Sequence, residues 1–151
     1  MARRSEGLDP NVPHADVTHK VIGVAMGVHN ALGPGHREEV YEQAMVRRLP
    51  EAGVGVQEQF PVEIALDSGT LLTYYLDLLV EGEVIVELKA LSHPVTNDDI
   101  AQVIDYLAAT GYRVALLINF GRTRLEFRRI LPPRKLAERR HREWSKPAHN
   151  P

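Results

Sequence analysis

The spacing of hydrophobic residues changes along the chain and outlines a succession of helices and strands. Over residues 16–32, apolar side chains recur at three- and four-residue steps, which indicates an amphipathic helix. Gly33-Pro34-Gly35 ends that helix, because glycine and proline do not continue a helix easily. The same spacing predicts a second helix over residues 37–49, which Gly53 and Gly55 end.

Beyond residue 55 the apolar spacing falls to two, which is typical of β-strands. The turn sequences Asp67-Ser68-Gly69 and Glu81-Gly82-Glu83 separate the first three strands. Thr96 or Asn97 can cap a later helix, and Asp98-Asp99 in its first turn suits the helix dipole. The remaining predicted elements are strands over residues 56–66, 71–80 and 84–91, a helix over 97–111, and strands over 114–120 and 125–130. The order ααβββαββ predicts an α/β protein.

Charge divides the chain into an acidic body and a basic end. Residues 16–131 form the predicted folded domain and hold ten basic against sixteen acidic side chains, a net charge of −6. Residues 1–15, with two prolines and few apolar residues, are expected to be a flexible arm. Residues 132–151, with six basic and two acidic side chains, are expected to be a disordered tail. This is not the uniformly positive field of a DNA-coating protein, so phosphate binding would need cations or local arginines.

Composition excludes several classes of protein. Cysteine is absent, which excludes a disulfide scaffold, thiolate zinc sites, iron–sulfur clusters and cysteine nucleophiles. The longest apolar run, residues 21–28, has eight residues, whereas a membrane-spanning helix needs about twenty. The first residues show no signal-peptide core. We therefore expect a soluble, cytoplasmic protein.

The third predicted strand is apolar enough to be central in a sheet, yet it carries Glu87 and Lys89, which project from one face. A hairpin centred on Gly82 places Asp77 opposite Glu87, where like charges repel. A divalent cation such as magnesium or manganese would convert that repulsion into coordination. Lys89 could then orient a water or stabilise a developing negative charge, as phosphodiester hydrolysis requires. An ordinary ion pair on a half-exposed strand explains the same residues equally well.

Several ordered motifs resemble those of a known nuclease family. Asp77, followed after nine residues by Glu87-Leu88-Lys89, resembles the motif of the PD-(D/E)xK nuclease superfamily. Gly35-x-x-Glu38-x-x-Tyr41 is similar to the signature of the GxxExxY proteins, a bacterial and archaeal family of that superfamily. The resemblance covers about residues 16–131. It implies a restriction-endonuclease-like fold, in which helices flank a mixed central sheet.

The resemblance also implies roles for particular residues. Asp77 and Glu87 would be metal ligands for Mg²⁺ or Mn²⁺, with Glu38 as an extra acid from the helix before the sheet. Lys89 would position water or phosphate. The residues at 102 and 106 match the Gln-x-x-x-Tyr motif of the RecB-like exonuclease branch, which supports the active site from the following helix. The candidate catalytic residues are therefore Glu38, Asp77, Glu87, Lys89, Gln102 and Tyr106.

The function expected from the resemblance is a divalent-metal-dependent nuclease that hydrolyses DNA. An alternative is a catalytically silent binding or assembly module that keeps the nuclease fold and acts with a partner protein or as a homo-oligomer. A third reading keeps the same site but directs it at RNA or nucleotides. The densest basic cluster of the body could contact flanking phosphates or form surface ion pairs, and it comprises Arg113, Arg122, Arg124, Arg128 and Arg129.

Overall fold

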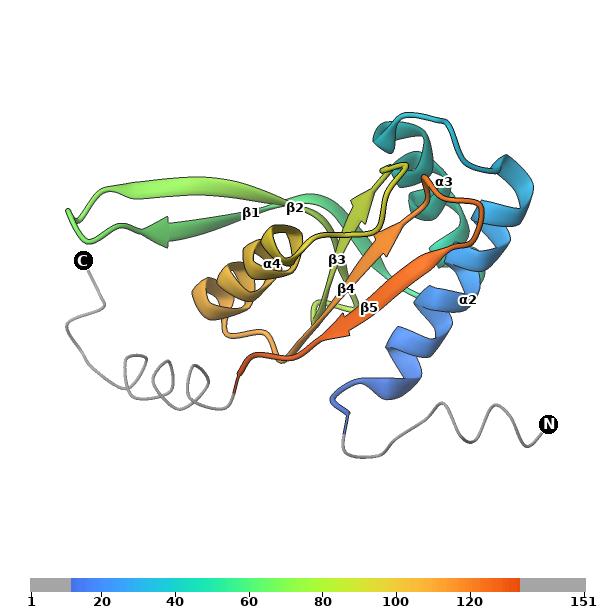
Figure 1. Ribbon diagram of the computed structural model, residues 1–151. Helices are drawn as coiled ribbons and strands as arrows, with labels where there is room; N and C mark the ends of the chain where they lie inside the picture. The colour runs from blue at the N-terminus through green and yellow to red at the C-terminus, as the bar shows by residue number, and fades with distance from the viewer. Residues whose placement is uncertain (1–11, 134–151) are drawn as a thin grey trace.

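The computed structural model describes residues 12–133 and confirms the predicted order of elements (Figure 1). The elements are α2 (Ala15–Leu32), α3 (Glu38–Glu51), β1 (Val56–Ala65), β2 (Leu71–Val80), β3 (Val84–Lys89), α4 (Asn97–Thr110), β4 (Val114–Asn119) and β5 (Glu126–Ile130). Their bounds differ from the predicted ones by one or two residues. Most of the expected N-terminal arm and basic tail lies outside the described residues.

The five strands form one mixed sheet in the order β1-β2-β3-β4-β5. Neighbouring strands are antiparallel except β3 and β4, which run parallel and are connected through α4. A parallel pair needs such a crossover, because a short hairpin cannot return the chain to the same end of the sheet. Helices α2 and α3 pack on one face and α4 on the other, so the expected mixed sheet between helices is confirmed.

Strand β3 is apolar on both faces because helices cover both sides of it. Val84, Val86 and Leu88 belong to the core beneath α2 and α3, whereas Ile85 belongs to the core beneath α4. The alternation of a strand therefore directs Glu87 and Lys89 to the side of α4.

The β1–β2 hairpin extends past the end of α4 (Figure 1). Its far part leaves several apolar side chains exposed, among them Leu71 at 54% and Tyr75 at 57%. The predicted turn after β1 is confirmed, with Gly69 at a φ of 87° and the Leu66 N–H donating to the Thr70 carbonyl. None of the helices in residues 12–133 is long and apolar enough to cross a membrane.

The turn between α2 and α3 is held by Tyr41, which is fully buried. The Tyr41 hydroxyl donates to the Gly33 carbonyl at 2.6 Å and accepts from the His36 N–H at 3.2 Å. Its ring stacks on Phe120 with a centroid separation of 4.6 Å. Tyr41 thus fixes the entry into α3, and Glu38 is the first residue of that helix.

Candidate active site

Strands β2 and β3 part where the two predicted metal ligands lie. The pairing follows the expected register from Val80–Val84 to Leu78–Val86 and is not continued beyond it. There the Leu88 N–H donates to Asp77 Oδ2 at 2.8 Å, and the Asp77 N–H donates to Glu87 Oε1 at 3.0 Å. Two carboxylates therefore replace the strand hydrogen bonds, and one oxygen of each takes no part in these backbone bonds.

Burial makes this pair of acids hold a proton. Glu87 is only 7% exposed, and burial raises its pKa to about 9, with the negative charge of Asp77 adding to the rise. Burial also raises the pKa of Asp77, while the hydrogen bond from Leu88 opposes the rise. A buried and a half-buried carboxylate in contact cannot both ionise easily, so the pair retains a proton at neutral pH.

Lys89 is the cation of this group of side chains. It lies two residues beyond Glu87 on the same strand, with Nζ 3.9 Å from Oδ1 of Asp99 on α4. Its positive charge also lowers the pKa values of Asp77 and Glu87, which places the ammonium among the acids and not only beside Asp99.

Asp99 is held by the predicted cap of α4. The Asp99 N–H donates to Thr96 Oγ1 at 3.2 Å, and the Thr96 N–H donates to Asp99 Oδ2 at 2.8 Å, which forms a capping box. One Asp99 oxygen thus caps the helix while the other faces Lys89. These cap hydrogen bonds lower the pKa of Asp99, so it stays ionised beside the ammonium.

Helix α3 brings a second pair of acids toward the same place. Glu38 is exposed at the first turn of α3; partial burial raises its pKa, Lys89 opposes that rise, and Asp77 adds to it. Glu42, one turn later, responds mainly to burial and also to the charges of Asp77 and Glu38. The sequence analysis did not select Glu42, although its i+4 spacing from Glu38 is a signal that could have identified it.

Gln59 is a further residue that the sequence analysis missed. In the β1–β2 register it lies opposite Asp77, between the pairs Glu58–Leu78 and Phe60–Leu76. Its Nε2 donates to both carboxylate oxygens of Glu42 at 3.1 Å, and its side chain lowers the pKa of Asp77. Gln59 has a φ of 49°, a left-handed conformation that non-glycine residues rarely adopt and that is often found at functional sites.

The α4 side of the site carries Tyr106 and Gln102. Burial raises the pKa of Tyr106 to about 12, and the charges of Glu87 and Asp77 contribute to the rise, so its phenol faces the acids. Gln102 lies three residues after Asp99 and four before Tyr106, on the same stripe of the helix. The Gln102 side chain is exposed, and it forms no hydrogen bond to the acids within residues 12–133.

The chemistry of Asp77 and Glu87 fits a divalent cation. Hard carboxylate oxygens suit Mg²⁺ and Mn²⁺, and magnesium is usually bound through one or two carboxylates with water completing its shell. A cation would also relieve the unfavourable contact between the half-buried Asp77 and the buried Glu87. Among residues 12–133, no cluster of three or more Asp, Glu or His side chains is arranged to hold a metal, so the observed donor set is this pair.

A polar residue at the end of β4 organises the loops next to the acids. Asn119 is fully buried, and its Oδ1 accepts from the Leu91 N–H at 2.8 Å and the Gly121 N–H at 3.1 Å. Its Nδ2 donates to the His93 carbonyl and to Glu126 Oε1. The sequence analysis missed Asn119, although a single amide residue at the end of an otherwise apolar strand is a signal that could have identified it.

Comparison with known proteins identifies the family. The profile described as the PD-(D/E)XK nuclease superfamily matches residues 15–130, and this chain therefore belongs to that superfamily. A search of curated proteins gives no match. The narrower GxxExxY assignment stays a prediction.

Two solved structures resemble this chain. One is an alkaline exonuclease (LHK-Exo) from Laribacter hongkongensis, with 18% identity, a TM-score of 0.50, and coverage of 71% of this chain and 62% of the exonuclease. The other is the protein SSO0001, with 13% identity, a TM-score of 0.52, and coverage of 73% and 60%. At these identities the likeness concerns the fold alone. This chain spans about three-fifths of the length of both proteins.

Proposed function

We propose that this protein is a divalent-metal-dependent nuclease that hydrolyses phosphodiester bonds in DNA. The observation that carries the proposal is the juxtaposition of the half-buried Asp77 carboxylate and the buried Glu87 carboxylate, with Lys89 two residues further along the same strand, at the carboxyl end of β3. In open α/β sheets, ligands bind preferentially outside the carboxyl ends of the strands. Membership of a nuclease superfamily supports hydrolysis as the reaction.

Each candidate residue has a distinct part in this proposal. Asp77 and Glu87 would hold Mg²⁺ or Mn²⁺, with Glu38 as a further ligand or a hydrogen-bond acceptor for a metal-bound water. The bound ion would acidify the attacking water and neutralise the scissile phosphate. Lys89, whose Nζ lies 3.9 Å from Oδ1 of Asp99, would stabilise the negative charge that develops on phosphate.

The residues of α4 complete the proposed site. Tyr106 stays protonated at neutral pH, so its hydroxyl can donate to a phosphate oxygen or accept from a water. Gln102, exposed on the same stripe, can reach a substrate that covers the acids. Both roles agree with the Gln-x-x-x-Tyr motif. The ordered motifs support membership of the GxxExxY family. The proposed place of action is the cytoplasm.

The second candidate is a catalytically silent module with the same fold that acts with a partner protein or as a homo-oligomer. The exposed apolar residues of the β1–β2 hairpin favour a surface that is covered in an assembly. The hydrogen bonds that hold Asp77 and Glu87 together, with Lys89 on the same face of β3, favour the nuclease, because a site without a catalytic role has no need for a buried acid beside a second carboxylate.

Cleavage assays test the proposal directly. Labelled single- and double-stranded DNA and RNA are incubated with Mg²⁺, Mn²⁺ or EDTA. We expect DNA cleavage with either metal, none with EDTA, and a rate reduced at least about 100-fold in Lys89→Ala, as for removal of a charge-stabilising group. Lys20→Ala, which removes an exposed cation near the start of α2, is the matched control and should cleave normally.

Two results would contradict the proposal. Equal cleavage in EDTA and in metal would show that the reaction does not depend on a divalent cation. Full activity in Lys89→Ala would show that the proposed site is not the catalytic site. Cleavage of RNA alone would retain the site and correct the substrate.

A further inference from the structure

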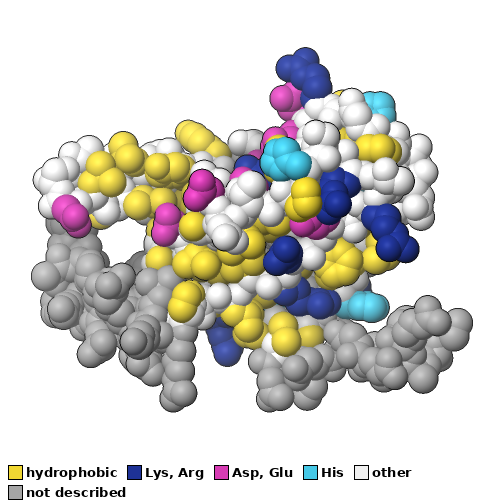
Figure 2. Space-filling view, viewed as in Figure 1, with side chains coloured by type: hydrophobic (Ala, Val, Ile, Leu, Met, Phe, Trp, Pro, Cys, Tyr) yellow, Lys and Arg dark blue, Asp and Glu magenta, His cyan; other side chains and the backbone are white. Residues whose placement is uncertain are grey.

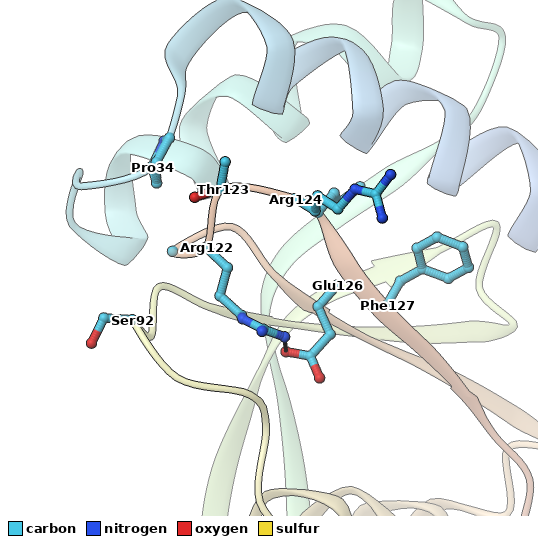
Figure 3. A pocket seen from close by; sticks show the side chains of 9 residues that line it. Pro34, Ser92, Arg122, Thr123, Arg124, Glu126 and Phe127 are labelled. Carbon is cyan, nitrogen blue, oxygen red and sulfur yellow. Dashed lines mark ion pairs between the residues drawn. The ribbon is translucent and has the colours of Figure 1, made fainter.

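A pocket of about 660 Å³ lies at the same end of the sheet as the acids (Figure 3). Three segments that are distant in sequence enclose it. They are Pro34 in the turn after α2, Ser92 in the loop after β3, and residues 121–127, which include the loop between β4 and β5.

The pocket lies close to the candidate catalytic residues along the chain and across the sheet. Lys89 pairs with Asn119 in the parallel β3–β4 register, and the Phe120 N–H donates to the Lys89 carbonyl at 2.8 Å. Ser92 follows Lys89 by three residues, a span of at most about 11 Å. With about 3.4 Å per nucleotide along one strand of a duplex, the pocket is within about three nucleotides of Lys89.

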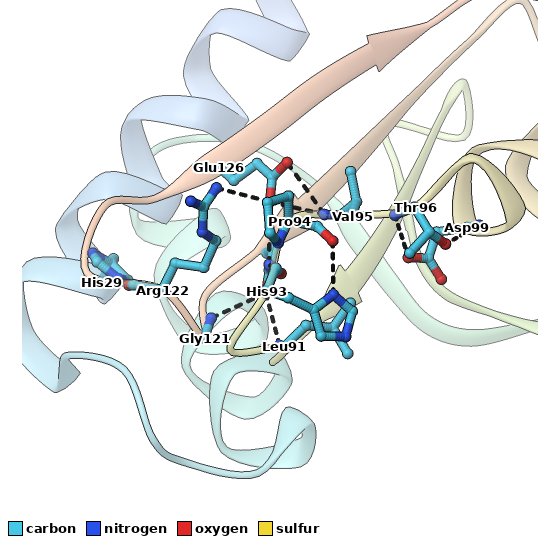
Figure 4. Close-up of polar contacts among 11 residues, drawn as sticks. His29, Leu91, His93, Pro94, Val95, Thr96, Asp99, Gly121, Arg122 and Glu126 are labelled. Carbon is cyan, nitrogen blue, oxygen red and sulfur yellow. Dashed lines mark hydrogen bonds and ion pairs between the residues drawn. The ribbon is translucent and has the colours of Figure 1, made fainter.

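The loop that forms the pocket is fixed from three sides (Figure 4). The His29 ring on α2 donates to the Arg122 carbonyl at 2.8 Å. Gly121 packs so closely that a Cβ added there would lie 2.4 Å from the Leu91 carbonyl oxygen. Asn119 binds backbone groups on both loops. The pocket is therefore preorganised, and a ligand would not have to order this loop.

The charge of the pocket favours an anion. Arg122 and Arg124 both line it, together with the hydroxyl-bearing residues Ser92 and Thr123. Nη1 of Arg122 is 3.7 Å from Oε1 of Glu126, a long contact that leaves the arginine side chain 42% exposed. Arg124 is exposed and forms no ion pair within the described part of the chain.

The acid of the pocket is already engaged by other donors. Glu126 accepts from the Val95 N–H at 3.1 Å and from Asn119 Nδ2 at 3.2 Å, in addition to Arg122. These bonds disperse its negative charge into the protein. Figure 2 shows Lys and Arg side chains over β5 and the loop before it, whereas hydrophobic side chains cover much of the β1–β2 hairpin.

We propose that this pocket, called the arginine pocket below, binds backbone phosphates of a nucleic-acid strand next to the bond that is cut. Arg124 and Arg122 are the phosphate-binding residues, because a guanidinium matches two phosphate oxygens with parallel hydrogen bonds. The pocket gives an acidic body the local positive charge that phosphate binding needs. The inference rests on the proposed nuclease function and assigns its substrate contact.

Binding without cleavage tests the arginine pocket. The Asp77→Asn protein in EDTA serves as the parent, and its affinity for a labelled DNA oligonucleotide is measured by fluorescence anisotropy at 50 and 200 mM salt. Arg124→Ala should bind more weakly than the parent and remove about 0.9 from the slope of log affinity against log salt on duplex DNA. The ratio of parent to variant affinity should therefore shrink about 3.5-fold between the two salt concentrations.

Three further variants sharpen the test. Arg122→Ala should act in the same direction as Arg124→Ala, and Arg124→Lys should restore most of the salt dependence because it keeps the charge. Lys20→Ala, an exposed cation near the start of α2, should bind like the parent. Because Arg124 is exposed, its substitution should leave the melting temperature unchanged.

The outcomes separate this inference from the proposed function. Parent-like affinity and salt slope in Arg124→Ala would overturn the arginine pocket, whether or not the wild type cuts DNA. Arginine-dependent binding in a protein that never cuts DNA would support the pocket and reject the nuclease.

Discussion

Glu87 has two roles at the scale of a single residue. Its carboxylate accepts the Asp77 N–H that the strand ladder leaves without a partner, and it is also one of the two proposed metal ligands. A glutamine could accept the same hydrogen bond through its amide oxygen but could not ionise. This difference allows the structural role and the charge to be measured separately.

The pH dependence of stability follows from the raised pKa of Glu87. The folded protein binds this proton up to about pH 9, whereas the unfolded chain releases it near 4.5. The folded state therefore holds more protons between these two values, and the free energy of unfolding should fall as the pH rises across that window. In Glu87→Gln without metal, this fall should become shallower, and the variant should be at least as stable as the wild type above neutral pH.

Urea unfolding in EDTA from about pH 5 to about pH 9 measures this effect. Glu63→Gln, an exposed acid on β1, is the control and should keep the wild-type slope. A Glu87→Gln protein that loses stability with rising pH as steeply as the wild type would contradict the assignment of the proton to this pair.

The sequence predicted part of this site because strand periodicity alone relates Asp77, Glu87 and Lys89. Gln59 could not be predicted from the sequence, since a left-handed φ in the middle of a strand does not change the pattern of apolar and polar residues. Asn119 was missed for a similar reason, because its four partners come from two loops and the start of β5, which meet only in the folded protein. The family resemblance supplied Glu38, but not the acid one turn later.

At the scale of elements, the β3–α4–β4 unit fixes the geometry of the site. Periodicity and capping residues predicted this unit well, including the cap at Thr96. The predicted third strand was two residues too long. β3 ends at Lys89 because the Leu91 N–H donates to the Asn119 side chain instead of continuing the ladder with its neighbour.

The close approach of the two loops beside this unit predicts a strong effect of Gly121→Ala. The new Cβ would lie 2.4 Å from the Leu91 carbonyl oxygen and 2.5 Å from the Leu91 nitrogen, and backbone atoms cannot move aside as a flexible side chain does. We expect a loss of about 1–3 kcal/mol in the free energy of unfolding, as for other overpacked positions. Thermal denaturation checks it.

Gly23→Ala is the matched control for that variant. Gly23 is an exposed helical residue with nothing within 4 Å of an added Cβ, so alanine should stabilise α2 by about 0.5–1 kcal/mol. Equal stability of Gly121→Ala and the wild type would show that the loops are not in contact as described.

At the scale of the whole molecule, the polar chemistry and the apolar surface are separated. The acids, Lys89 and the arginine pocket lie around the carboxyl ends of β3 and β4, whereas Leu71 and Tyr75 lie on the far part of the hairpin. A nuclease and an assembly module would use opposite ends of this molecule. Metal-linked stability reports on the first end only, so it distinguishes the two readings without a substrate.

A metal that binds only the folded protein raises its stability by RT ln(1 + [L]/Kd), about 2.7 kcal/mol at one hundred times Kd. For a domain of this size, the melting temperature should rise by about 5–10 °C in Mn²⁺ relative to EDTA. Asp77→Asn should abolish the rise and keep or increase the metal-free stability, because the amide oxygen still accepts the Leu88 N–H while the repulsion from Glu87 is gone.

Asp67→Asn, in the exposed turn at the far end of the hairpin, should keep the full rise. If Asp77 served only an ion pair with Lys89, its replacement would lower the metal-free melting temperature and Mn²⁺ would have no effect on the wild type. Identical melting of the wild type in Mn²⁺ and in EDTA would therefore favour the assembly module over the nuclease.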